Sequence, residues 1–128
     1  PDEEVIARSP GMKYRHYAPR ASLVLVEGTP DRIPSKIREL VENQKRRGLK
    51  VGVVVTSESL ADFGAHVVKV VGSRRDHRTI ARNLFRVLRE LDAEGVQWAA
   101  VEGIEPSGIG LAIMNRLKKA AGHHVVRV

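Results

Sequence analysis

Apolar residues along this chain fall into short continuous runs that alternate with longer, periodic stretches. Continuous apolar runs that end in turn residues are typical of strands covered on both faces of a sheet. The run from Val51 to Val55 is the most strand-like, because its hydrophobicity is unbroken. In all we expect five strands, at Ser22 to Glu27, Val51 to Val55, His66 to Val71, Val96 to Glu102 and Val125 to Val128.

The segments between these runs carry apolar residues at helical spacing. The clearest case is Thr79 to Glu94, where apolar residues recur every three or four positions and predict an amphipathic helix. The segment from Pro34 to Arg47 begins with a proline suited to a first turn and ends in cations that favour a helix C-terminus. We also expect a helix at Leu111 to Ala121 and a short helical turn at Leu60 to Gly64.

The alternation of strands and helices favours an α/β fold. Apolar strands separated by helices predict a Rossmann-like, three-layer α/β/α arrangement with a mainly parallel sheet of about five strands. The chain has 128 residues, which is enough for one compact core. Hydrophobic residues make up 42% and charged residues 29%, so the composition is that of an ordinary globular domain.

Charge and residue usage narrow the function classes. A net charge of +7 favours phosphate-bearing partners or anionic surfaces. The chain has no cysteine, which excludes disulfides, thiolate metal sites and a cysteine nucleophile. No apolar run is long enough to span a membrane, so we expect a soluble, cytoplasmic protein without a membrane partner.

Four loops are candidates for ligand binding. In sheets of this kind, ligands bind outside the carboxyl ends of the strands. The loops expected there are Gly28 to Pro30, Thr56 to Ser59, Gly72 to Arg78 and Gly103 to Gly110.

The loop from Gly72 to Arg78 is the strongest candidate for an anion site. Its cations and one hydroxyl precede a helix N-terminus, where backbone N–H groups and the helix dipole favour an anion. The residues of this site are Ser73, Arg74, Arg75 and Arg78. In the alternative interpretation, the arginines are solvated and Asp76 caps the helix.

The loop from Gly103 to Gly110 contributes Ser107 and Gly108 to the same candidate anion site. Its spacing matches neither the dinucleotide-binding fingerprint nor the Walker loop, and tight packing between strand and helix explains its glycines equally well. His123 and His124 have no third ligand nearby in sequence, so no metal site is predicted. No catalytic residue is predicted in the chain either, because no motif for nucleophilic or acid–base catalysis is present.

Arginine recurs along one side of the expected helix between Thr79 and Glu94 and at its start. The residues are Arg78, Arg82, Arg86 and Arg89, at steps of four, four and three. Such a stripe is suited to RNA or to a partner domain. A solvated helix face with no partner is the alternative, since exposed charges usually have none.

The opening segment carries a motif that resembles a known family. Its residues are Ser9, Pro10, Gly11, Met12, His16, Tyr17, Ala18 and Pro19, which are similar to the interdomain linker of the two-domain threonylcarbamoyl-AMP synthases. The segment GLAIMNRLKKAAG, from Gly110 to Gly122, resembles the C-terminal signature of the same family. The two motifs lie near opposite ends of the chain.

The resemblance implies an enzyme larger than this chain. Such enzymes join threonine, bicarbonate and ATP into threonylcarbamoyl-adenylate for transfer RNA modification, with ATP and Mg²⁺ bound by an N-terminal YrdC-like catalytic domain. That domain is the implied partner, and its signature is absent here, as in a fragment of a longer protein. We therefore expect residues 1–20 to be the interdomain linker and residues 21–128 an accessory or regulatory domain, inactive alone and without its own cofactor.

The resemblance also assigns roles to linker residues. In the family the linker covers the nucleotide pocket of the catalytic domain, which places Tyr17 and His16 near the adenylate. Lys13 and Arg15 would add positive charge near phosphates, while the Ser-Pro-Gly-Met segment shapes the backbone. Without the resemblance, the segment would be interpreted as a loosely packed terminal tail.

A second function class stays open. The arginine stripe and the loop from Gly72 to Arg78 would also suit an RNA- or nucleotide-binding module without catalytic activity, with transfer RNA as its partner. The two hypotheses are compatible, because an accessory domain could hold transfer RNA near the enzyme.

Overall fold

The computed structural model describes residues 18–128. The predicted linker residues Ser9 to Met12, Lys13, Arg15, His16 and Tyr17 therefore lie outside the described residues.

Strands and helices alternate through the described part of the chain, as predicted. The strands are β1 (Ser22–Glu27), β2 (Val51–Val55), β3 (Val67–Val70), β4 (Trp98–Glu102) and β5 (Val125–Arg127). The α-helices are α2 (Ile33–Arg46), α3 (His77–Ala93) and α4 (Ile109–Ala120), and the short 3₁₀ helices are η1 (Pro30–Arg32) and η2 (Ser57–Ser59).

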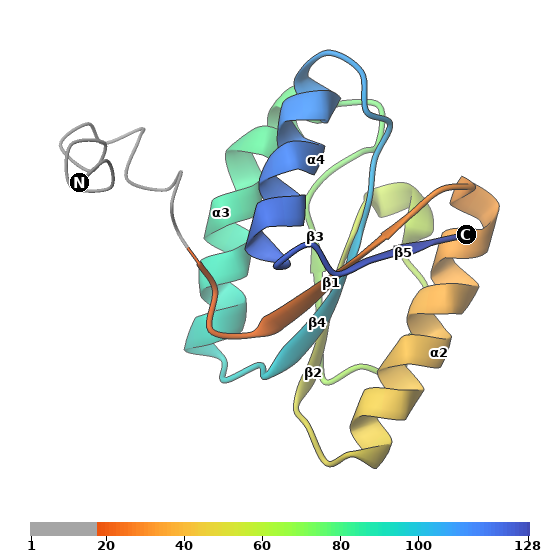
Figure 1. Ribbon diagram of the computed structural model, residues 1–128, viewed down its shortest axis with the longest axis vertical. Helices are drawn as coiled ribbons and strands as arrows, with labels where there is room; N and C mark the ends of the chain where they lie inside the picture. Colours follow the sequence, from red (N-terminus) through yellow and green to blue (C-terminus); the bar gives the residue numbers. More distant parts are fainter. Residues whose placement is uncertain (1–17) are drawn as a thin grey trace, which may run out of the picture.

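The five strands form one parallel sheet in the order β3-β2-β4-β1-β5. Strand β4 lies between β1 and β2, with Val24 opposite Ala100 on one side and Val53 opposite Ala100 on the other. Helices α3 and α4 cover one face of the sheet and α2 covers the other (Figure 1). The predicted three-layer α/β/α architecture is thus confirmed.

The core consists of two clusters, one on each side of the sheet. Because successive residues of a strand point to opposite faces, β1 divides its side chains between the clusters. Leu23 and Leu25 pack under α3 and α4, whereas Val26 packs under α2. The five residues of β2 and the five of β4 are all buried, as expected for central strands of a covered parallel sheet.

One predicted element is wrong. Residues 60–64, from Leu60 to Gly64, are irregular rather than helical, and the helical turn is η2, which begins three residues earlier. The Asp62 carboxylate accepts a hydrogen bond from the Gly64 backbone N–H at 3.0 Å. Such an Asx turn competes with helix formation, which explains the irregular backbone.

Candidate functional site

A crevice opens at the carboxyl end of the sheet, between β1 and β4. The chain leaves β1 toward α2 on one face and leaves β4 toward α4 on the opposite face (Figure 1). Ligands of doubly wound sheets bind at such a topological switch point. The crevice has a volume of about 310 Å³, which is at the small end of the range for ligand sites.

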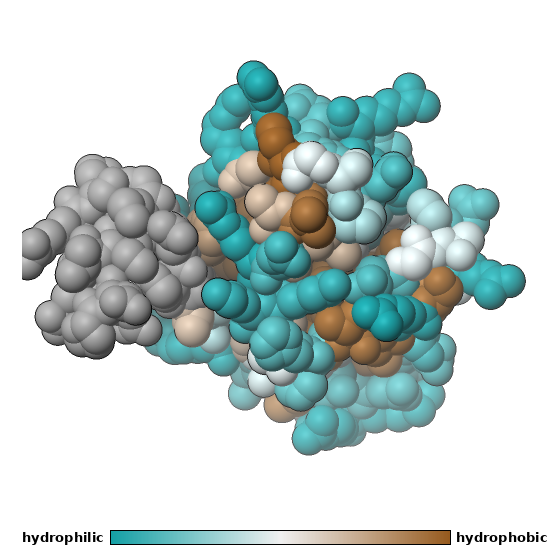
Figure 2. All heavy atoms as spheres, turned by 45° about the horizontal axis from the view of Figure 1, so that its top comes forward, coloured by the Kyte–Doolittle hydropathy of each residue, from teal (hydrophilic) through white to brown (hydrophobic). Residues whose placement is uncertain are grey.

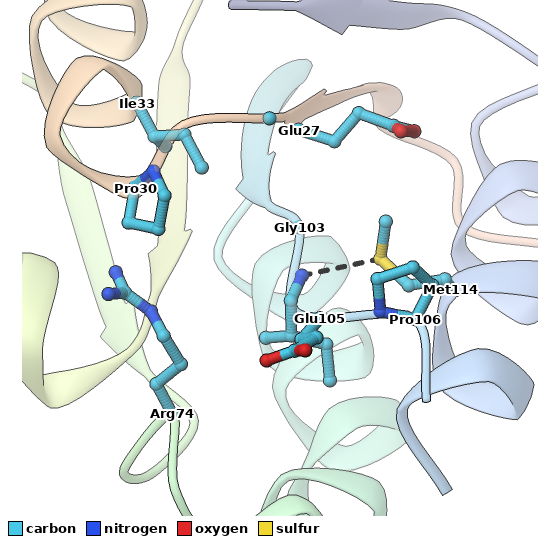
Figure 3. A pocket seen from close by; sticks show the side chains of 10 residues that line it. Glu27, Pro30, Ile33, Arg74, Gly103, Glu105, Pro106 and Met114 are labelled. Atoms are coloured by element: carbon cyan, nitrogen blue, oxygen red, sulfur yellow. Dashed lines mark hydrogen bonds between the residues drawn. The ribbon is translucent and has the colours of Figure 1, made fainter. Parts of the chain in front are cut away.

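The walls of the crevice are mostly apolar (Figure 3). The apolar lining residues are Pro30, Ile33, Ile104, Pro106 and Met114, and the charged ones are Glu27, Arg74 and Glu105. On this side of the molecule, apolar surface also emerges between hydrophilic side chains (Figure 2). At the start of α4, Ile109 and Leu111 are 42% and 49% exposed.

A buried carboxylate connects the loops behind the crevice. Glu102, the last residue of β4, is 4% exposed. Its Oε1 accepts hydrogen bonds from the Thr56 backbone N–H at 2.7 Å and the Thr56 hydroxyl at 3.0 Å. Its Oε2 accepts hydrogen bonds from the Ser59 hydroxyl at 2.9 Å and from Arg74 Nη2 at 2.7 Å. Glu102 is therefore well satisfied, as a buried charge must be.

Arg74 joins this buried cluster to the crevice. Its Nη2 donates to Glu102 Oε2 and to the Ser59 hydroxyl oxygen, both at 2.7 Å. Its side chain is 28% exposed and lines the crevice. The pairing with Glu102 fixes the position of the guanidinium group at the crevice wall.

A second carboxylate binds the loop that precedes α3. Glu58 accepts hydrogen bonds from the Arg74 backbone N–H at 2.7 Å and from the Ser73 hydroxyl at 2.5 Å. These bonds stabilise the charged form and lower the pKa of the Glu58 carboxyl to about 2, with the Arg74 amide as the larger cause. The protein's own carboxylate thus uses two of the donors that were predicted to hold an external anion.

The structure brings part of the predicted anion site together. Arg74, Arg75 and Arg78 line an open hollow of about 580 Å³ beside the crevice. Glu105 and Ile109 also line this hollow, whereas Ser107 and Gly108 do not. Anion binding by these residues stays a prediction.

Asp76 caps α3, as the alternative interpretation proposed. Its carboxylate accepts hydrogen bonds from the Thr79 backbone N–H at 3.1 Å and the Thr79 hydroxyl at 2.7 Å. The hydroxyl bond is the largest cause of the lowered pKa of Asp76. The helix consequently begins at His77, two residues earlier than predicted.

The arginine stripe lies along α3. Arg78, Arg82 and Arg86 are exposed and Arg89 is half-buried. Arg86 pairs with Glu90 at 2.7 Å, so the stripe is not purely cationic. Within residues 18–128, no group of three or more acidic, histidine or cysteine side chains is placed to hold a metal ion.

The predicted linker enters the domain beside the end of α3. Asp92 accepts hydrogen bonds from the backbone N–H groups of Arg20, at 3.0 and 3.1 Å, and Ala21, at 3.2 Å. These residues immediately follow Pro19, the last residue of the motif. The carboxylate thereby fixes where the chain joins β1.

Comparison with known proteins identifies the family. The family model described as threonylcarbamoyl-AMP synthase, C-terminal domain, matches residues 1–122. The chain belongs to this family. It is 45% identical to the threonylcarbamoyl-AMP synthase of Pyrococcus abyssi over 95% of its own length and 34% of the relative's. It is 44% identical to that of Bacillus subtilis over 93% and 33%.

Solved structures of threonylcarbamoyl-AMP synthases share the fold. Pyrococcus abyssi Sua5 complexed with L-threonine matches with a TM-score of 0.79 and 46% identity, covering 95% of this chain and 34% of that one. A Pyrococcus abyssi Sua5 variant, in which a histidine and the following tyrosine are replaced by alanine, matches with a TM-score of 0.77 and 41% identity over 95% and 33%. The C-terminal Sua5 domain from Pyrococcus horikoshii matches with a TM-score of 0.70 and 40% identity, covering 87% of this chain and all of that one.

The chain therefore spans about a third of the length of its curated relatives and corresponds to their C-terminal domain. In the part of the chain that the structure describes, no helix is both long and apolar enough to cross a membrane.

Proposed function

We propose that this chain is the linker and accessory domain of a threonylcarbamoyl-AMP synthase. In this proposal, a YrdC-like catalytic domain joined to residue 1 makes threonylcarbamoyl-adenylate from threonine, bicarbonate and ATP, with Mg²⁺ bound alongside the ATP. The observation that carries the proposal is the family match over residues 1–122, which covers the predicted linker as well as the folded domain.

The linker would act on the active site of the catalytic domain. His16 and Tyr17 form the chain's one His-Tyr pair, and the solved variant of the Pyrococcus abyssi relative replaces a histidine followed by a tyrosine, which supports a role for such a pair. A tyrosine offers the nucleotide an aromatic face and a hydroxyl donor. The folded domain would hold the end of this segment through the Asp92 carboxylate, which binds the backbone just beyond the motif.

A chimeric enzyme tests this proposal. This chain replaces the matching C-terminal third of the Pyrococcus abyssi enzyme, and threonine-dependent pyrophosphate release is measured. We expect Tyr17→Ala to lower the rate by about tenfold or more, because a contact to a charged nucleotide is lost. Tyr17→Phe removes only the hydroxyl, so its rate shows whether the hydroxyl or the aromatic ring makes the contact. Tyr14→Phe and Tyr14→Ala, in the spacer of the motif, are the matched controls.

Two outcomes would contradict the proposal. Rates that are unchanged in both Tyr17 variants, and after deletion of the whole chain, would show that the linker has no role at the active site. Equal losses in the Tyr14 and Tyr17 variants would indicate a general defect of the segment instead of a contact made by Tyr17.

RNA binding is a second candidate function, supported by the charge of α4. No acidic residue occurs after Glu105, so the α4 segment is purely basic. Arg116 of α4 lies 5.7 Å from the ring centroid of Phe85 on α3, so its charge adjoins the arginine stripe. Lys119 is one turn further along the same face.

Salt dependence tests the RNA proposal. If the surface of α3 and α4 binds transfer RNA, the affinity should fall steeply as the salt concentration rises. Arg82→Gln and Arg116→Gln should each reduce the slope of log affinity against log salt concentration by about one. Arg38→Gln, on the opposite face of the sheet, is the control. Absence of binding at low salt would remove this candidate.

A further inference from the structure

The crevice between β1 and β4 has features that the proposed function does not use. It belongs to the folded accessory domain, whereas the linker is expected to act on a separate catalytic domain. The Pyrococcus horikoshii structure consists of the C-terminal domain alone, so a domain of this kind folds without its catalytic partner. A ligand of the crevice can therefore be sought with this chain by itself.

Arg74 presents unused hydrogen-bond donors at the crevice wall. Both of its hydrogen bonds to side chains come from Nη2, which binds Glu102 and Ser59. The guanidinium group has five N–H donors, and among the residues that the structure describes, Nε and Nη1 have no side-chain acceptor, which leaves their N–H groups available to a ligand. The guanidinium projects toward Pro30 at the crevice wall (Figure 3). The buried bonds hold it in place, so a planar carboxylate binds with little loss of side-chain freedom.

Glu105 places a negative charge at the rim of the crevice. Its side chain is exposed at the rim of the crevice and, within the described residues, has no hydrogen bond or ion pair. The other carboxylate of the lining, Glu27, is already balanced by Lys118 at 3.7 Å and Arg127 at 3.5 Å. Arg75 and Arg78 line the neighbouring hollow with Glu105, but Arg74 is the one cation among the described residues that line the crevice, and it is paired with Glu102. The Glu105 carboxylate therefore favours a cationic group in the crevice.

Apolar side chains surround these two charged groups: in Figure 3, Pro30 and Ile33 lie above Arg74, and Pro106 and Met114 lie on the far side of Glu105. Ile33, Ile104 and Met114 are almost fully buried and form this apolar wall. A ligand that satisfies the crevice therefore needs an anionic group, a cationic group and a small apolar body. A simple anion such as phosphate would leave Glu105 unpaired and the apolar wall uncovered.

We propose that the crevice binds an α-amino acid with an apolar side chain. The ligand carboxylate accepts hydrogen bonds from the guanidinium of Arg74, its ammonium group faces Glu105, and its side chain packs on Ile33, Ile104 and Met114. The accessory domain then senses a free amino acid at a site distinct from the linker. This assignment does not depend on adenylate formation.

Titration of the chain with matched probes tests the proposal. The probes are L-leucine, isocaproate, which lacks the ammonium group, isoamylamine, which lacks the carboxylate, glycine, which lacks the side chain, and inorganic phosphate. Binding is followed through the backbone amide signals of residues such as Gly28, Gly103 and Glu105 in two-dimensional NMR spectra. We expect leucine to bind, and each of the other probes to bind at least about tenfold more weakly.

Two substitutions assign the contacts. Glu105→Gln should weaken leucine about tenfold and leave isocaproate unchanged, because only leucine carries the ammonium group. Arg74→Lys keeps a charge beside Glu102 but removes the planar set of donors, so leucine and isocaproate should both weaken while isoamylamine does not. Glu42→Gln and Arg78→Lys, which lie outside the crevice, are the matched controls. Thermal melts check that each variant is folded.

Several results would overturn the proposal. Leucine that causes no amide shifts up to about 10 mM, beyond the range of specific binding, excludes the site. Phosphate that binds as well as leucine would assign a plain anion site instead. Equal binding of leucine and isocaproate by the unsubstituted chain would show that Glu105 contributes nothing. Shifts confined to residues away from the crevice would place the amino acid elsewhere.

Discussion

The two ends of the parallel sheet are held together in different ways. At the carboxyl end, the loops meet around Glu102, a buried carboxylate that binds two hydroxyl groups, a backbone amide and a guanidinium. At the amino end, exposed or half-buried side chains bind backbone N–H groups near the strand starts. Asp92 binds Arg20 and Ala21, Gln97 binds Lys50 at 2.8 Å, and His66 Nδ1 accepts from Val51 at 2.9 Å.

The polar contacts at the two ends differ in how much their burial costs. Side chains at the amino end satisfy backbone donors that would otherwise lack partners, and they do so close to water at little cost. Burial of Glu102 and part of Arg74 at the carboxyl end carries a desolvation penalty, which apolar side chains of similar size would avoid. This buried pair fixes the position of the Arg74 guanidinium group.

The largest effect is expected from Glu102→Gln. The substitution keeps the size of the side chain but leaves Arg74 without its buried counter-charge, and should lower the free energy of unfolding by about 3 kcal/mol. Urea unfolding measures the loss. Glu105→Gln, on an exposed side chain, should change stability by less than about 0.5 kcal/mol. Equal effects of the two substitutions would contradict the assigned role of the buried cluster.

Glycines at the two ends give a second comparison. Gly28, after β1, and Gly48, before β2, both have positive φ angles, of 121° and 82°. A Cβ atom at Gly28 would overlap the carbonyl oxygen of Val128, whereas one at Gly48 meets no atom within 4 Å. Gly48→Ala should cost about 1 kcal/mol from backbone strain, and Gly28→Ala clearly more. A larger loss for Gly48→Ala in thermal unfolding would refute this ranking.

Asp92→Ala tests the amino end directly. The substitution removes the acceptor for the Arg20 and Ala21 N–H groups, and because water can replace it, the loss of stability should be about 1 kcal/mol. Hydrogen exchange at these two amides should accelerate more than elsewhere. Asp31→Ala, at an exposed acid in η1, serves as the control. Unchanged exchange at both amides would show that Asp92 does not hold the chain entry.

The smallest effect concerns pH and Glu58. Its folded-state pKa, about 2, lies below the ordinary value of 4.5, so the unfolded chain binds more protons between these values. Its stabilising contribution is therefore complete above about pH 4.5 and is lost as pH falls toward about 2. The difference in melting temperature between the protein and Glu58→Gln should shrink over that window. A difference that does not change with pH would contradict the lowered pKa.

Local signals predicted the fold well. Val51 to Val55 and Ser22 to Glu27 were predicted with the bounds of β2 and β1, because continuous apolar runs ended at turn residues. The ends of the α-helices differ from the prediction by one or two residues, and at α3 the early start is explained by the Asp76 cap. The helical turn predicted for Leu60 to Gly64 is wrong, because the Asx turn at Asp62 competes with helix formation there.

The candidate site was harder to predict. The charge of Arg74 led to its prediction as an anion-site residue. Its partner Glu102 lies 28 residues away, on a strand whose place in the sheet no local pattern reveals. The sequence does contain one indication of a buried carboxylate, because Glu102 is an acidic residue at the end of an otherwise apolar strand. Glu58 lay in a loop already expected at the carboxyl end of the sheet. Its bonds to Ser73 and Arg74 depend on how β2 and β3 pair.

The central position of β4 constrains how the chain can fold during synthesis. Strands β1 and β2 are made first, but each pairs with β4, and they do not pair with one another. In a nascent chain that ends before Trp98, β1 lacks both of its neighbours, because β4 and β5 are not yet made. Strand β2 can pair only with β3 at that stage. Strands β1 and β2 therefore cannot be joined in one sheet until Glu102, the last residue of β4, has left the ribosome. The residue that joins the loops of the finished domain thus also ends the strand that joins β1 to β2.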